Sequence, residues 1–189
     1  MTENLAEKIS RYFVVNNMAK EDDGEVLSFM LFLIFSNVQQ VFAFIVIAFI
    51  FNAFPHMIAF VIFFVSLKFQ AGGAHANKHW VCFTVSTGLS VAVCLLCKTV
   101  DLPSYINIIV SAITFILVLL KAPVIHPNNP KPERRRKFMR KNSIIIAAIQ
   151  GALIIAGSFV MPIISLAGAL GGFAASVTLL LPVPENETE

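Results

Sequence analysis

The chain has 189 residues, of which 57% are hydrophobic and only 13% are charged, and its mean hydropathy is +0.80. A soluble domain of this length needs far more polar surface, and the apolar residues come in long blocks. The composition therefore excludes an ordinary soluble protein and indicates an integral membrane protein. The three cysteines are odd in number and none lies in a loop that looks extracellular, so no disulfide framework is expected, and the net charge of +3 is uninformative by itself.

The first 25 residues (1–25) are expected to lie at the membrane surface. They lack the apolar stretch and the small-residue cleavage site of a signal peptide, so targeting is expected to rely on the membrane spans. A helix over residues 2–20 would place most of its apolar side chains near one face and its charges elsewhere; these apolar residues are Leu5, Ile9, Tyr12 and Phe13. This pattern is typical of an interfacial amphipathic helix.

Six apolar segments follow, and most have the length of about 20 residues that a membrane-spanning helix needs. They are Val26–Phe51, Phe54–Leu67, Trp80–Cys97, Leu102–Leu120, Ser143–Val160 and Pro162–Leu181. The second is short, and the last two form one apolar run that Pro162 interrupts, which predicts two helices joined by a tight turn. The expected fold is one all-α membrane domain over residues 1–189, with about six transmembrane helices.

The positive charges predict the orientation of these helices. With the N-terminus in the cytoplasm and six alternating spans, every Lys and Arg except Lys98 faces the cytoplasm. Both termini and the loops 68–80 and 121–142 then lie on the cytoplasmic side of the membrane. We see no internal repeat of the kind that indicates an inverted-repeat transporter.

The loop after the second segment, KFQAGGAHANKHWVC, is a polar island between apolar runs. His75 and Cys82 would stand about 10 Å apart along one straight helix, but a corner at Gly72 and Gly73 would fold the imidazole back over the thiol. A thiol beside a protonated histidine or at a helix N-terminus becomes a nucleophile, and such a pair suits acyl transfer. Spacing alone favours the alternative, an ordinary histidine and cysteine near the membrane surface.

Two other patterns could in principle indicate metal or redox chemistry. His75 and His79 have i, i+4 spacing, but no nearby carboxylate completes a zinc motif, so we predict no metal and no cofactor. Cys94 and Cys97 lie within an apolar helix and are expected to be small core residues.

Polar side chains elsewhere have two interpretations each. Asn37, Gln39 and Gln40 lie inside the first apolar segment, where they would line a peptide channel or make structural hydrogen bonds between helices, and the structural role is favoured. The basic run in the loop 121–142 would bind acidic substrate residues, or it would follow the positive-inside rule and contact anionic lipids. Its residues considered for substrate binding are Lys131, Arg134, Arg135 and Arg136.

Two motifs resemble those of the AgrB (accessory gene regulator B) family of bacterial membrane peptidases. GGAHANKHWVCFTVS is similar to that family's G-x-H-A element, followed by Cys seven residues after the His and by a later Ser. KAPVIHPNNPKPERRRKFMRK is similar to its A-P-x-x-x-x-N-x-P segment and the basic run that follows. Together the two motifs and the arrangement of apolar segments extend the resemblance over nearly the whole chain.

The resemblance implies a function. His75 and Cys82 correspond to the family's catalytic residues, which cut the C-terminal part from a short precursor peptide, AgrD. A side chain of the peptide then attacks the thioester and forms a cyclic thiolactone or lactone, a quorum-sensing signal. The resemblance also implies a homodimer, contact with membrane lipids and no nucleic-acid partner. Lys68 replaces an Arg of some members, which keeps the charge but loses a bidentate contact.

Supporting roles follow for several residues near the pair. His75 would act as general base toward the thiol and then as acid toward the leaving amine. Backbone N–H groups around Gly72 and Gly73, or at the start of the third span, are candidates for an oxyanion hole, although the glycines alternatively only make the turn. Ser86 lies one helical turn after Cys82, where it would orient the histidine or a substrate carbonyl, or simply pack between helices.

Other functions remain as alternatives. The first is a small membrane transporter or exporter of a signalling peptide that lacks peptidase activity, and the second is a scaffold without enzymatic activity. A zinc peptidase lacks its motif here, and a rhomboid-like serine peptidase lacks the G-x-S-x-G sequence.

Overall fold

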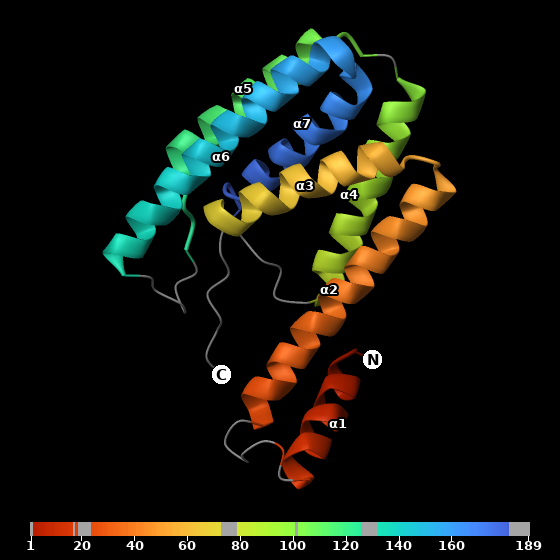
Figure 1. Ribbon diagram of the computed structural model, residues 1–189, viewed down its shortest axis with the longest axis vertical. Helices are drawn as coiled ribbons and strands as arrows, with labels where there is room; N and C mark the ends of the chain where they lie inside the picture. Colours follow the sequence, from red (N-terminus) through yellow and green to blue (C-terminus); the bar gives the residue numbers. More distant parts are fainter. Residues whose placement is uncertain are drawn as a thin grey trace. The chain divides into compact units, whose positions relative to one another are not determined.

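The computed structural model describes residues 2–16, 18, 24–72, 79–100, 102–125 and 132–181 (Figure 1). Within these residues the chain forms seven helices and no strand. The helices are α1 Thr2–Val15, α2 Gly24–Ile50, α3 Phe54–Ala71, α4 His79–Thr99, α5 Tyr105–Lys121, α6 Glu133–Val160 and α7 Pro162–Val177. The all-α class is therefore confirmed.

The six predicted apolar segments correspond to helices α2 to α7. Three of these helices, α2, α3 and α6, have the length and apolar composition needed to cross a membrane. Helices α5 and α7, and the part of α4 from Phe83 to Thr99, are apolar but shorter. The exact number of spans and the cytoplasmic placement of both termini stay predictions.

Two helices extend beyond their apolar segments. Helix α3 continues past Leu67 through Lys68 to Ala71, so the helix is longer than the apolar segment that predicted it. Helix α6 begins at Glu133, so that residues 133–142 of the expected basic loop are helical. Arg, Lys, Glu and Met are good helix formers, and an acidic residue in the first turn interacts favourably with the positive end of the helix dipole.

The chain divides into two compact units, residues 1–46 and 47–189, with the boundary inside α2. The single domain expected from the sequence stays a prediction. In the first unit, α1 is shorter than the predicted 2–20 helix. Ala6 and Ser10 are buried, and the Ser10 hydroxyl donates a hydrogen bond of 2.5 Å to the carbonyl oxygen of Gly24 at the start of α2. Leu5 and Tyr12 stay exposed, as expected of an apolar face available to lipid.

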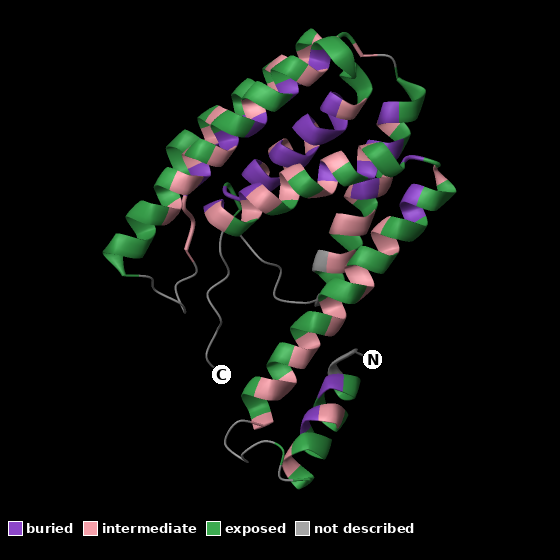
Figure 2. Cartoon of the chain, in the orientation of Figure 1, coloured by how far each residue is buried: buried purple, intermediate pink, exposed green. Residues whose placement is uncertain are grey.

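In the second unit, α7 carries the most continuous buried stretch among the described residues (Figure 2). Its contacts with α3, α5 and α6 form the core of this unit, and small residues bring the backbones close together. At Gly171, an added Cβ would lie 2.4 Å from the carbonyl oxygen of Phe60 on α3. The buried apolar cluster at one end of this core consists of Leu67, Ala71, Val118, Ala122, Ala147, Ala175 and Leu179.

Side-chain amides also connect these helices. The Gln150 Nε2 on α6 donates to the Phe63 carbonyl and to the Ser66 Oγ on α3, both at 2.9 Å. The Asn107 Nδ2 on α5 donates to the carbonyl of Pro162 at 2.9 Å. Such bonds between helices favour one packing arrangement, whereas apolar contact alone would allow several.

The break predicted at Met161–Pro162 is confirmed. Helix α6 ends at Val160, and α7 begins at Pro162, whose fixed φ and missing N–H suit the first position of a helix. The Asn107 bond to the Pro162 carbonyl ties this turn to α5. At the opposite end of the unit, α3 and α5 both end in the cluster that contains Ala71 and Ala122, and this end carries the candidate site.

Candidate functional site

Cys82 lies in the first turn of α4, three residues after the helix begins at His79. The first N–H groups of a helix lack partners within the helix, and together with the helix dipole they favour a negative charge nearby. Helix N-termini of this kind favour the thiolate form of a cysteine in general, and this role of Cys82 stays a prediction. Its proposed partner His75, and Gly73, lie outside the described residues, so the contact between the two catalytic side chains stays a prediction.

Gly72 ends α3 in a conformation that favours glycine. Its φ is +74°, in the left-handed region, and its N–H donates to the Lys68 carbonyl at 3.0 Å. Because this N–H already caps the helix, it does not serve as a free donor to an oxyanion. The Gly72 N–H is therefore a poorer candidate for the oxyanion hole than the N–H groups in the first turn of α4, whose role stays a prediction.

The structure brings the two sequence motifs into contact. The Val124 N–H, just after α5, donates to the Ala71 carbonyl at 3.0 Å, and Gly72 and Val124 form an isolated parallel β-bridge. A Cβ added to Gly72 would lie 2.1 Å from the Val124 carbonyl oxygen. Sequence reasoning identified both segments but did not predict that they touch, and it missed Val124 altogether.

Comparison with known proteins covers both motif segments. A family model described as AgrB, accessory gene regulator B, matches residues 6–179. This chain belongs to the AgrB family. The resemblance seen in the sequence is thus confirmed.

A curated relative of this AgrB family member is "Accessory gene regulator protein B" of Staphylococcus carnosus (strain TM300), which is 28% identical over 115 residues. The matched region covers 61% of this chain and 60% of the relative. No solved structure matches.

Two further candidate residues lie on the helices that flank the segment containing His75. Lys68 is in the last turn of α3, where a cation suits the negative end of the helix dipole, and its Nζ lies 5.6 Å from the centre of the Phe64 ring. Ser86 is half-buried on α4, one turn after Cys82. Neither position tests the proposed roles of these side chains, which stay predictions.

The polar residues of the first apolar segment lie on α2. Asn37 is exposed, and its amide donates to the carbonyl of Leu33, four residues earlier in the same helix, at 2.8 Å. Gln39 and Gln40 are half-buried. Asn37 therefore makes a local bond within α2, and substrate binding by the two glutamines stays a prediction.

The basic residues after the second motif begin α6. Arg134, Arg135 and Arg136 are all exposed, and Glu133 and Lys137 form an exposed ion pair at 2.7 Å. Lys131 lies outside the described residues. In the structure, these arginines form part of the first turns of α6. Their binding to an acidic partner or to anionic headgroups stays a prediction.

The described residues contain no group of three or more His, Cys, Asp or Glu side chains that could hold a metal ion. Cys94 and Cys97 are buried free thiols in α4, as predicted for core residues.

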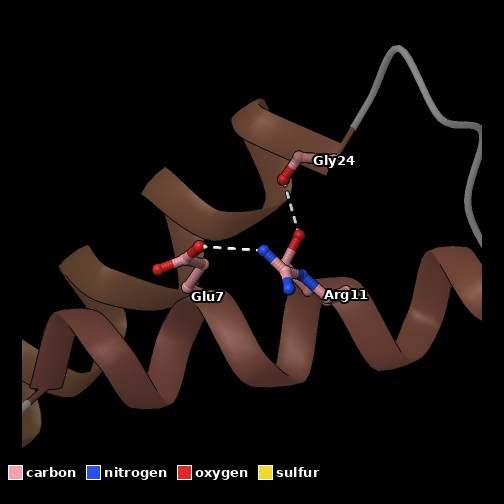
Figure 3. Close-up of polar contacts among 4 residues, drawn as sticks. Glu7, Arg11 and Gly24 are labelled. Atoms are coloured by element: carbon pink, nitrogen blue, oxygen red, sulfur yellow. Dashed lines mark hydrogen bonds and ion pairs between the residues drawn. The ribbon is translucent and has the colours of Figure 1, made fainter.

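The first unit contains a cleft of about 640 Å³ that the sequence did not indicate. Polar contacts join some of its lining residues, where Arg11 pairs with Glu7 at 3.3 Å and the Ser10 hydroxyl donates to the Gly24 carbonyl (Figure 3). The apolar part of the lining comes from Val14, Phe29 and Phe32. The cleft has both apolar and charged walls, and only the apolar periodicity of α1 was visible in the sequence.

Proposed function

We propose that this protein is a membrane cysteine endopeptidase that cleaves the C-terminal part from an AgrD-like precursor peptide. The reaction passes through an acyl-enzyme thioester on Cys82 and ends in closure of a thiolactone or lactone ring. The observation that carries the proposal is membership of the AgrB family together with the contact between the family's two motif segments at Gly72 and Val124. A site at the membrane surface suits a peptide that is itself held there.

In the first step, His75 takes the proton of the Cys82 thiol, and the thiolate attacks the carbonyl carbon of the scissile peptide bond. The C–N bond then breaks, the new amine takes the proton from His75, and the acyl group stays on the Cys82 sulfur. N–H groups in the first turn of α4 are placed on the same helix as the nucleophile and are the best candidates to bind the oxyanion.

In the second step, a thiol or hydroxyl of the peptide attacks the thioester carbonyl, and His75 takes its proton. The new bond closes the ring, and the Cys82 thiolate leaves and is reprotonated. Exchange of one thioester for another, or for an ester, is close to thermoneutral, so ring closure from the acyl-enzyme itself needs no nucleotide, provided that water is kept from the thioester.

Other residues are proposed to bind or orient the peptide. Arg134, Arg135 and Arg136, with Lys131, would attract acidic residues of the precursor, and Lys68 would place a further positive charge near the catalytic loop. Ser86 would orient His75 or the substrate carbonyl, and Gln39 and Gln40 would contact the peptide. The enzyme is proposed to act as a homodimer, in contact with lipids of a bacterial plasma membrane, with its active site toward the cytoplasm.

The test is intact-mass analysis of the purified protein in lipid, mixed with candidate precursor peptides from the neighbouring gene. Wild type is expected to carry a peptide adduct and to release a ring, whereas Cys82→Ala and His75→Ala are expected to show neither. Cleavage that persists in Cys82→Ala would refute the cysteine mechanism. Transport of an unprocessed peptide into vesicles by Cys82→Ala would instead favour the exporter.

A further inference from the structure

We infer that the contact between the end of α3 and the segment after α5 is a latch that positions the catalytic loop, with Gly72 and Val124 as positioning residues. This inference rests on the proposed function and goes beyond the catalytic pair. Gly72 is the last described residue before the loop that contains His75, which is only three positions further along the chain. The direction in which the chain leaves Gly72 therefore determines where that loop begins.

Two backbone hydrogen bonds stabilise the latch, one within α3 and one to the segment after α5. The Gly72 N–H is bound to the Lys68 carbonyl within α3, and the carbonyl of the preceding Ala71 accepts the Val124 N–H from the segment after α5, each at 3.0 Å. Neither bond depends on a side chain. The start of the catalytic loop is thus attached to a second part of the chain that is about 50 positions away in sequence.

The residues next to the latch are packed in the buried core. Ala71 and Ala122 are 1% and 6% exposed, and Val118, one turn earlier on α5, is fully buried. All three belong to the same apolar cluster. A joint that is built on a packed core has little freedom to shift, because interiors are close-packed. Such rigidity is what a catalytic pair needs, since a misplacement of about 1 Å can cost about 100-fold in rate.

Two independent constraints require glycine at position 72. A φ of +74° is unfavourable for any residue with a Cβ, and the Cβ would in addition lie 2.1 Å from the Val124 carbonyl oxygen. Because that oxygen belongs to the backbone, a smaller side chain at position 124 cannot relieve the clash. Gly88 on α4 gives a matched control, since nothing lies within 4 Å of a Cβ added there.

The experiment compares Gly72→Ala, Val124→Pro and Gly88→Ala with wild type in lipid. Val124→Pro removes the N–H that binds the Ala71 carbonyl and adds no side chain at position 72. Two quantities are measured: kcat and KM for cleavage of the precursor, and the pH dependence of alkylation at Cys82, followed by peptide mapping so that the buried thiols do not interfere.

We expect Gly72→Ala and Val124→Pro to lower kcat by between about tenfold and 100-fold, with KM changed by less than about threefold. The pH dependence of Cys82 alkylation should move toward that of an ordinary cysteine, because His75 no longer meets the thiol. Gly88→Ala should match wild type in both measurements. The double variant Gly72→Ala/Val124→Ala should be no more active than Gly72→Ala.

A loss of activity that only follows the loss of folded protein, with an unchanged alkylation profile, would overturn the latch. The same holds if both variants keep the kcat of wild type. If Gly72→Ala does not fold, Val124→Pro decides by the same two measurements. Failure of the proposed function looks different, because wild type itself would then lack the adduct, or Cys82→Ala would still cleave, and the inference would fall with it.

Discussion

The two units of the chain are held together internally by different means. In the core formed by α3, α5, α6 and α7, backbones meet at glycines, and side-chain amides bond from one helix to another. In the N-terminal unit, the described polar contacts between or along its helices include one buried serine bond and an exposed ion pair within α1. The first unit leaves an apolar face of α1 exposed, whereas the second buries α7.

This difference shows which interactions determine how helices pack against one another in an apolar environment. Lipid tails are as apolar as leucine, so burial of apolar surface alone does not favour one helix partner over another. Small residues that allow close approach, and polar groups that need a partner, supply the choice. The core of the second unit uses both devices, and it is this core that supports Gly72 and Val124. The comparison can be sharpened by variants that remove one device at a time.

The largest effect on stability is expected from Gly171→Ala on α7. The new Cβ would lie 2.4 Å from the Phe60 carbonyl oxygen, so α3 and α7 must move apart. Overpacking costs about 1–3 kcal/mol, which exceeds the gain of about 1 kcal/mol in helix propensity. We expect a net loss of up to about 2 kcal/mol in the free energy of unfolding, measured by denaturant titration in bicelles.

Gly88→Ala is the matched control for this change. The position is exposed and helical with open space around it, so alanine should leave stability unchanged or raise it by up to about 1 kcal/mol. Equal losses in both variants would show that the close approach of α7 to α3 is not what holds the core.

A smaller effect is expected from Gln150→Leu on α6. Leucine removes both bonds from the Gln150 amide to α3, and bonds of this kind between membrane helices contribute about 0.6 kcal/mol on average. The Gln150 Oε1 is buried without a hydrogen-bond partner in the described structure, so its removal offsets part of the loss. We expect a net decrease of about 1 kcal/mol or less in the same unfolding measurement.

Asn37→Leu on α2 serves as the comparison for Gln150→Leu. The Asn37 amide bonds only within its own helix in the contacts described, and its side chain is exposed. A surface change of this kind should fall within about 0.5 kcal/mol of wild type. A larger loss for Asn37→Leu than for Gln150→Leu would contradict the view that amide bonds between helices are specific to the core.

The same contrast explains what could be read from the sequence. Apolar length predicted all six helices of α2 to α7 and the break at Pro162, because both signals are local. Hydropathy could not show that α6 begins at Glu133, since charged residues form helix as readily as apolar ones. Gln150 and Asn107 are each a lone amide within an apolar run, which is a signal that the sequence carries. The same kind of signal predicted roles for Asn37, Gln39 and Gln40.

For the candidate site, the sequence supplied residues but not their arrangement. His75 and Cys82 could be named because their types and spacing match the family motif, and Cys82 indeed falls in the first turn of α4. The contact between Gly72 and Val124 could not be predicted from the sequence, because it joins backbone atoms of distant segments and depends on no side chain. The glycine was visible, whereas the reason for it lies in the fold.

In the N-terminal unit, the expected effect is confined to α1. Ser10→Ala removes the hydrogen bond to the Gly24 carbonyl, and a buried bond of this kind contributes about 1 kcal/mol. Amide hydrogen exchange in α1, followed by mass spectrometry in lipid, should therefore quicken by about fivefold. Arg11→Ala should leave exchange unchanged, because its ion pair with Glu7 is exposed and such pairs are worth little. If Arg11→Ala has the greater effect, the exposed ion pair stabilises α1 more than the buried serine, and the contrast between the two units must rest on the glycines and amides of the core alone.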